Sequence, residues 1–135
     1  MSATLTRLAL EQSLGNDKGV QAVLGNPIRL FDAPVKQSAW PFAVWRRWES
    51  KPLGGDYDKA QEHIATLEIV CKNTGIDEAR KCIEAVQNWA VNAKPSHADL
   101  NITLLMAAYA DVFRAIDGRT FYGVVRLKII SEIKE

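Results

Sequence analysis

The amino-acid sequence predicts an α+β fold, in which two main helices pack on one face of a mainly antiparallel sheet of about five strands. Apolar residues recur every three or four positions in two parts of the chain, as in amphipathic helices. Other runs are rich in aromatic and β-branched residues, which is typical of strands, and two apolar runs flank an Asp-Gly pair that favours a hairpin turn. The elements follow in the order helix, three strands, helix and two strands.

Length and composition indicate one domain over residues 1–135. Hydrophobic residues make up 47% of the chain and charged residues 24%, which is typical of a globular protein and argues against disorder. The 17 basic and 16 acidic residues leave a net charge of +1, too little for strong bulk attraction to nucleic acid or to an anionic membrane. No signal peptide or membrane span is apparent, and two cysteines are too few for a disulfide framework. We therefore expect a cytoplasmic protein with no membrane partner.

Helical segments are expected at residues 2–14, 18–24 and 74–91. Gly25 and Pro27 follow the second segment, where these residue types end a helix. Thr74 stands in the N-cap position of the third segment, because its hydroxyl can accept a hydrogen bond from the first turn. The apolar stripe expected on the first helix comprises Leu5, Leu8, Ala9 and Gln12.

Strands are expected at residues 28–31, 41–48 and 61–72, ahead of the third helical segment. The polar connection at residues 50–60 is longer than a tight hairpin needs and contains two glycines. Leu53 and Tyr57 give this connection apolar groups that a merely solvated loop does not require. We therefore expect it to be mobile in the free protein and to order against a partner.

The two C-terminal strands are expected to form a hairpin around a two-residue type I′ turn at Asp117 and Gly118. Counting outward from the turn pairs Ala115 with Thr120 and continues to Met106 opposite Ile129. One face of the hairpin then collects the apolar residues Met106, Ala108, Ala110, Val112, Val125, Leu127 and Ile129. The opposite face collects Tyr109, Asp111, Tyr122, Arg126 and Lys128. Such a separation of apolar from polar residues supports this register.

No catalytic motif stands out, and we expect neither a metal nor a cofactor. His63 and His97 lie far apart in the sequence, and the glycine patterns of phosphate-binding loops are absent. Cys71 and Cys82 fall in apolar strand and helix positions, where buried thiols with a structural role are expected. A Cys–His catalytic pair drawn from these residues is the minor alternative.

The segment Trp45-Arg46-Arg47-Trp48 supports two interpretations. Aromatic rings and arginines that alternate on a strand can stack on bases and contact phosphates, so a small nucleic-acid-binding module is one hypothesis. Tryptophan and arginine are also enriched in protein interfaces, and the chain lacks the basic surplus of nucleic-acid binders. We therefore favour a strand with one face in the core and the other in an interface.

The C-terminal hairpin, from Ala110 to Ile130, resembles that of a family of small tail-completion or tail-terminator proteins. The family occurs in long-tailed phages, prophages and gene transfer agents. Other segments agree in order along the chain, namely Arg-Leu-Phe-Asp-Ala-Pro at 29–34, Trp-Pro-Phe-Ala-Val at 40–44 and Ala-Thr-Leu-Glu-Ile at 65–69. The resemblance covers nearly the whole chain, and the Asp-Gly hairpin and the Pro-Phe strand opening are its distinctive parts.

This resemblance implies a structural protein rather than an enzyme. Members of the family are similar to subunits of a ring, usually of six copies, that caps the tail tube, ends its polymerisation and joins it to the head connector. It implies assembly in the cytoplasm and then a place at the head–tail junction of the particle, with DNA passing through the ring without sequence-specific binding. The residues expected to contact a neighbouring subunit or the tail-tube protein are Trp45, Arg46, Arg47, Trp48, Leu53, Tyr57, Arg126 and Lys128.

Overall fold

The computed structural model describes residues 2–33, 39–54, 59–72 and 75–134. Its elements are α1 (Ser2–Asn16), α2 (Lys18–Leu24), β1 (Leu30–Phe31), β2 (Phe42–Pro52), β3 (Ala60–Lys72), α3 (Ile76–Asn92), β4 (Leu100–Arg114) and β5 (Thr120–Ile133). Within this described part, the strands form one sheet in the order β1-β2-β3-β5-β4, in which only β1 and β2 run parallel. The predicted α+β class and element order are confirmed. The helices of the described part are not long and apolar enough to cross a membrane.

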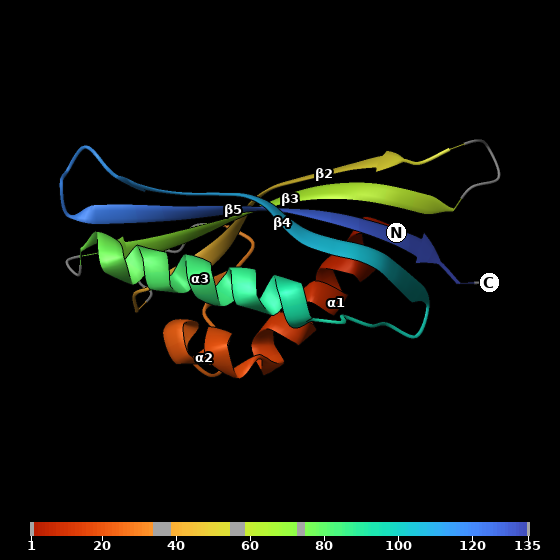
Figure 1. Ribbon diagram of the computed structural model, residues 1–135, viewed down its shortest axis with the longest axis horizontal. Helices are drawn as coiled ribbons and strands as arrows, with labels where there is room; N and C mark the ends of the chain where they lie inside the picture. The colour runs from red at the N-terminus through yellow and green to blue at the C-terminus, as the bar shows by residue number, and fades with distance from the viewer. Residues whose placement is uncertain (1, 34–38, 55–58, 73–74, 135) are drawn as a thin grey trace.

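The helices lie together on one side of the sheet, so that the molecule has two layers (Figure 1). The inward side of the sheet packs on the apolar faces of the helices, and α3 runs along β4 and β5. Buried core side chains from the two layers include Leu10, Leu24, Leu67, Ile69, Val86, Val125, Leu127 and Ile129. The other side of the sheet, here called the outer face, is not covered by a helix of the described part.

Close packing of α3 on β5 depends on a glycine in the strand. A Cβ atom at Gly123 would lie 2.7 Å from Cδ1 and 2.8 Å from Cγ1 of Ile83, closer than real carbon contacts. Ile83 therefore occupies the space that a side chain at Gly123 would need, and the helix approaches the strand backbone directly. Trp89 secures the other end of α3, because its Nε1–H donates a 2.9 Å hydrogen bond to Ser13 of α1.

The inward face of α1 differs from the predicted stripe. Leu8 is 46% exposed, whereas Thr6, Leu10 and Leu14 are buried together with Ala9. Thr6 lies inward because its hydroxyl donates a 3.0 Å hydrogen bond to Ser131 of β5. Both buried hydroxyl groups therefore have a hydrogen-bond partner in the core. Of the predicted stripe, Ala9 is buried and Leu5 is half-buried, whereas the inward positions of Leu8 and Gln12 were wrong. Gly75 occupies the N-cap position of α3 without a side-chain capping bond, so the predicted N-cap was wrong; Thr74 itself lies outside the described residues.

The register of the C-terminal hairpin is confirmed near the turn and wrong beyond it. Ala110 pairs with Val125, as predicted, but the register shifts between Ala107 and Tyr109, so Leu127 pairs with Ala107 instead of Ala108. The bulge rotates the rest of β4 by one position, which places Met106 on the outer face with 44% of its surface exposed. A second shift follows between Ile102 and Leu104.

The hairpin turn is wider than the two-residue turn predicted for it. The Ala115 N–H donates to the Thr120 carbonyl at 2.8 Å, and the Gly118 N–H closes a β-turn onto the Ala115 carbonyl at 3.0 Å. Gly118 has φ of 72°, so the predicted positive φ is confirmed. Asp117 accepts hydrogen bonds from the N–H groups of Arg119 and Thr120, both at 2.8 Å, and from the Thr120 hydroxyl at 2.7 Å. These bonds lower the pKa of Asp117 to about 2.

The connection between β2 and β3 is shorter than predicted. Residues 50–52 continue β2 and pair with residues 61–63 of β3, because the strands extend past the predicted loop boundary. The Leu53 N–H then donates a 3.0 Å hydrogen bond to the Ala60 carbonyl. Leu53 is half-buried, while Tyr57 lies outside the described residues.

Candidate functional site

The segment 45–48 has its tryptophans on the inward face, because a bulge interrupts the alternation of the strand. Trp45 pairs with Leu67 and Arg47 with Thr66, and the register shift between them places both Trp45 and Trp48 toward the helices. Trp45 is 7% exposed and donates a 3.1 Å hydrogen bond to Glu11 of α1. The two indole rings meet edge to face, with centroids 5.3 Å apart. Trp45 is thus a core residue, and its ring does not form an exposed platform for stacking on bases.

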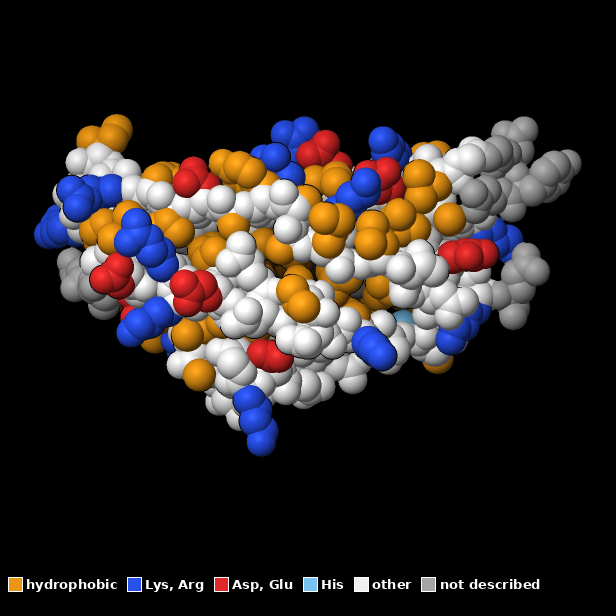
Figure 2. All heavy atoms as spheres, viewed as in Figure 1, with side chains coloured by type: hydrophobic (Ala, Val, Ile, Leu, Met, Phe, Trp, Pro, Cys, Tyr) orange, Lys and Arg blue, Asp and Glu red, His pale blue; other side chains and the backbone are white. Residues whose placement is uncertain are grey.

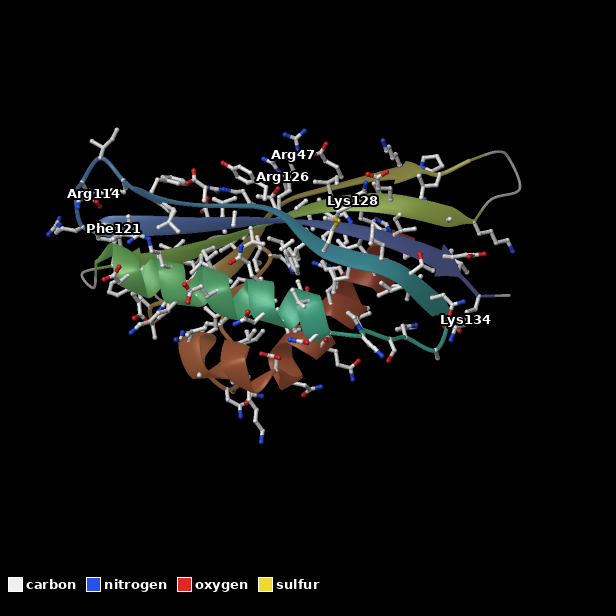
Figure 3. All side chains as sticks on the ribbon, in the orientation of Figure 1. Arg47, Arg114, Phe121, Arg126, Lys128 and Lys134 are labelled. Atoms are coloured by element: carbon white, nitrogen blue, oxygen red, sulfur yellow. The ribbon has the colours of Figure 1, made fainter. Side chains whose placement is uncertain are left out.

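The two arginines of the segment point outward and are paired with carboxylates. Arg46 Nη2 lies 3.2 Å from Glu68 Oε1, and Arg47 Nε lies 3.0 Å from Glu49 Oε1. Figure 3 places Arg47, Arg126 and Lys128 on the outer face, as the sequence predicted for the last two. Two more cations share one carboxylate here, since Lys51 and Lys128 lie 3.8 and 3.7 Å from Glu62. In the middle of the outer face, four cations are therefore paired with three carboxylates, which compensate most of their charge.

The hairpin end of the outer face is different, because it combines exposed aromatic rings with an arginine. The Arg126 guanidinium lies 5.0 Å from the centroid of the Tyr109 ring, within cation–π range. Phe113 and Tyr122 pack with ring centroids 5.4 Å apart. Tyr109 and Phe113 are 46% and 42% exposed. Tyrosine and arginine are among the residue types that contribute most of the binding energy in protein interfaces.

His63 lies in a buried hydrogen-bond network that sequence reasoning missed. Its Nε2 is 2.8 Å from Ser131 Oγ, and its Nδ1 is 2.7 Å from Ser50 Oγ. Trp48 Nε1–H also points at Nδ1, at 3.3 Å. Because an indole N–H can only donate, Nδ1 accepts, and the ring proton is assigned to Nε2, which donates to Ser131. Burial lowers the pKa of His63, so the neutral form is favoured.

The position of His63 could have been read from the strand pattern. In the predicted strand 61–72, His63 shares the face of Ala65, Leu67 and Ile69, which are all buried. The network joins β2, β3 and β5 to Thr6 of α1 and thereby fixes the helix to the sheet. Nothing in the sequence identified its partners, because they lie up to 68 residues away along the chain.

The remaining candidate residues do not converge on a catalytic site. Cys71 and Cys82 are buried free thiols, and the hydrogen bond from Cys82 lowers the pKa of Cys71 and raises that of Cys82 itself. His97 accepts a 3.0 Å hydrogen bond from the Asp99 N–H in the connection before β4. No group of three or more His, Cys, Asp or Glu side chains in the described residues could hold a metal ion.

Comparisons with known proteins agree on one kind of relative. The profile of the family "Tail completion protein gp17" matches residues 9–132. A chain in the solved virion of a native gene transfer agent particle superposes with a TM-score of 0.84 at 17% identity, covering 97% of both chains. The gp17 protein of bacteriophage SPP1 superposes with a TM-score of 0.55 at 15% identity, covering 95% of this chain and 88% of gp17. No curated protein sequence matches. At these identities, the two structures show a shared fold.

Proposed function

The chain belongs to the tail completion protein gp17 family, and from this premise we propose that it is the tail terminator of a long-tailed phage or gene transfer agent. Membership makes it a structural protein of such a particle's tail. The match over residues 9–132 carries the proposal, because it spans nearly the whole fold rather than one motif. The similar fold of a chain in a gene transfer agent virion supports it.

In this role, copies of the chain form a closed ring, of six in the form we favour, that caps the tail tube and ends its polymerisation. The ring then joins the tail to the head connector. It assembles in the cytoplasm and remains at the head–tail junction of the finished particle. The net charge of +1 supports self-assembly, because near-neutral copies repel one another little. The exposed aromatic groups on the outer face supply surface for such contacts.

DNA passes through the channel of this ring without being held. The ion pairs on the outer face support this step, because Arg46, Arg47, Lys51 and Lys128 are paired with three carboxylates. A surface whose cations are mostly paired with carboxylates releases few counterions on contact with phosphate, so its affinity for DNA is low. The burial of Trp45 speaks against the alternative, a nucleic-acid-binding module that stacks bases on this strand.

Deletion of the gene from a particle-producing strain tests the terminator function. Tails of uncontrolled length and heads without attached tails are expected, and a plasmid copy of the wild-type gene should restore both. Imaging of intact particles should then place several copies of the chain in a ring at the head–tail junction. A single copy, or a position elsewhere in the particle, contradicts the proposal. Tight, salt-dependent DNA binding by the isolated chain would favour the nucleic-acid-binding module instead.

We also propose that the β2–β3 connection contacts the tail tube or a neighbouring copy, with Leu53 and Tyr57 as the contact residues. The half-buried position of Leu53 next to the last strand hydrogen bond supports this role. Replacing residues 53–59 with a Gly-Asn turn tests it, because the strands on either side are already paired. Normal tails and infectious or transducing particles from this variant would make the connection a spacer only.

A further inference from the structure

The tip of the β4–β5 hairpin presents one apolar side chain to solvent on an ordered turn. Ile116 is fully exposed, although its side chain is one of the most apolar in the protein. The three hydrogen bonds to Asp117 and the two backbone bonds around Ala115 hold the turn on either side of it. The hairpin projects at one end of the molecule (Figure 1), and apolar atoms cap it in Figure 2. An exposed apolar group on a rigid tip loses little entropy when it binds.

A groove of about 300 Å³ lies between α3 and the edge strand β4. It is lined mostly by apolar side chains, and Val91 on its rim is 82% exposed. In Figure 2 apolar side chains gather along the boundary between α3 and β4. Leu105 and Ala107 of β4, which also pack against the core, line the groove on the strand side. The lining residues are Gln87, Ala90, Val91, Leu105, Met106 and Ala107.

The tip and the groove each have an exposed charged side chain beside them. Arg119 is exposed beside Ile116, and the ion pairs of the described residues do not include it. Glu84 is exposed on α3, three residues before Gln87 and seven before Val91, which places it on the same stripe of the helix as the groove. It likewise has no ion-pair partner in the part of the chain that the structure describes. The Asp117 carboxylate at the tip already accepts three hydrogen bonds within the turn, which leaves the Arg119 guanidinium as the charged group there that can face Glu84.

We propose that Ile116 of one copy seats in the α3–β4 groove of a second copy, with Arg119 of the first facing Glu84 of the second. The contact rests on the proposed ring and names the surfaces that form it. One patch meets a different patch, which is the heterologous type of contact that closes rings. Ile116 lies ten residues from Met106, so at roughly 3.4 Å per strand residue the chain between tip and groove spans up to about 34 Å. A copy therefore cannot seat its own tip.

Thiol cross-linking between two single variants tests the contact. Ile116→Cys and Val91→Cys are co-expressed in particle-producing cells and treated with a short bismaleimide. A covalent dimer should form from the mixture, but not from either variant alone, because tip does not meet tip and groove does not meet groove. Ile116→Cys mixed with Lys18→Cys on α2 is the matched control. The wild-type chain, in which Cys71 and Cys82 are buried, gives the background.

A charge exchange keeps the test valid if a cysteine variant misfolds. Glu84→Arg and Arg119→Glu should each reduce the number of copies at the head–tail junction about tenfold, and the double variant should restore them. Particles that contain a ring of this chain but give no dimer and no charge rescue would overturn the contact and leave the terminator function intact. Particles in which the chain forms no ring would overturn both.

Discussion

Substitution of Gly123 by alanine tests how α3 is seated on the sheet. The added methyl group would lie 2.7 Å from Cδ1 and 2.8 Å from Cγ1 of Ile83, while its distance to the Ala79 carbonyl oxygen, 3.6 Å, is ordinary. Ile83 is itself buried in the core, so it has little room to move. Overpacking of this kind costs about 1–3 kcal/mol. The loss of unfolded-state entropy at an alanine offsets roughly 0.4–1 kcal/mol of that. We expect the free energy of unfolding to fall by about 1–2 kcal/mol.

Urea denaturation followed by tryptophan fluorescence measures the change, since the chain has four tryptophans. Ile83→Ala alone should cost about 2–5 kcal/mol through the cavity that it leaves. In the double variant, the alanine methyl at position 123 finds space, so the total cost should be smaller than the sum of the two single costs. Gly15→Ala is the matched control, because its Cβ would meet nothing within 4 Å in α1. It should leave stability unchanged or raise it by up to about 1 kcal/mol.

The reasoning is refuted if Gly123→Ala unfolds at the wild-type urea concentration. It is also refuted if the two substitutions are strictly additive, since additive costs mean that the two side chains do not compete for one space.

Three further predictions concern the turn and the buried network. Gly118→Val should lower the free energy of unfolding by about 1 kcal/mol or more, because a β-branched residue resists φ of 72°; a wild-type melting temperature would contradict this. Asp117, whose folded pKa of about 2 lies below its ordinary 3.8, contributes stability that is present above pH 3.8 and is lost as the pH falls toward 2. Asp117→Ala should therefore flatten the acid limb of a stability–pH curve between those values. His63→Phe should cost about 1–3 kcal/mol, because it leaves the Trp48 N–H without its acceptor and removes the hydrogen bond between His63 and Ser131. Because the folded pKa of His63 is lowered, wild-type stability should decline as the pH falls below 6.5, and this decline should be missing in His63→Phe.

The sequence alone determined the fold class, the element order and the inner part of the hairpin. These follow from local signals, namely apolar periodicity and the Asp-Gly turn, which act over a few residues. The outward direction of Arg126 and Lys128 followed from the same alternation, counted from the turn. The strand pattern could also have placed His63 on an apolar face, but we did not predict it there from the sequence.

Only the tertiary structure decided which faces of β2 and β4 point outward beyond their bulges. A bulge adds one residue to a strand, and its position is set by the partner strand and by the helices packed behind it. For this reason both Trp45 and Trp48 turn inward, and Met106 turns outward. The strand order and the partners of His63 likewise join residues that are far apart in the sequence, and so does the groove between α3 and β4. Local sequence patterns do not predict such contacts, because periodicity shows which face of an element is apolar but not which other element packs against it.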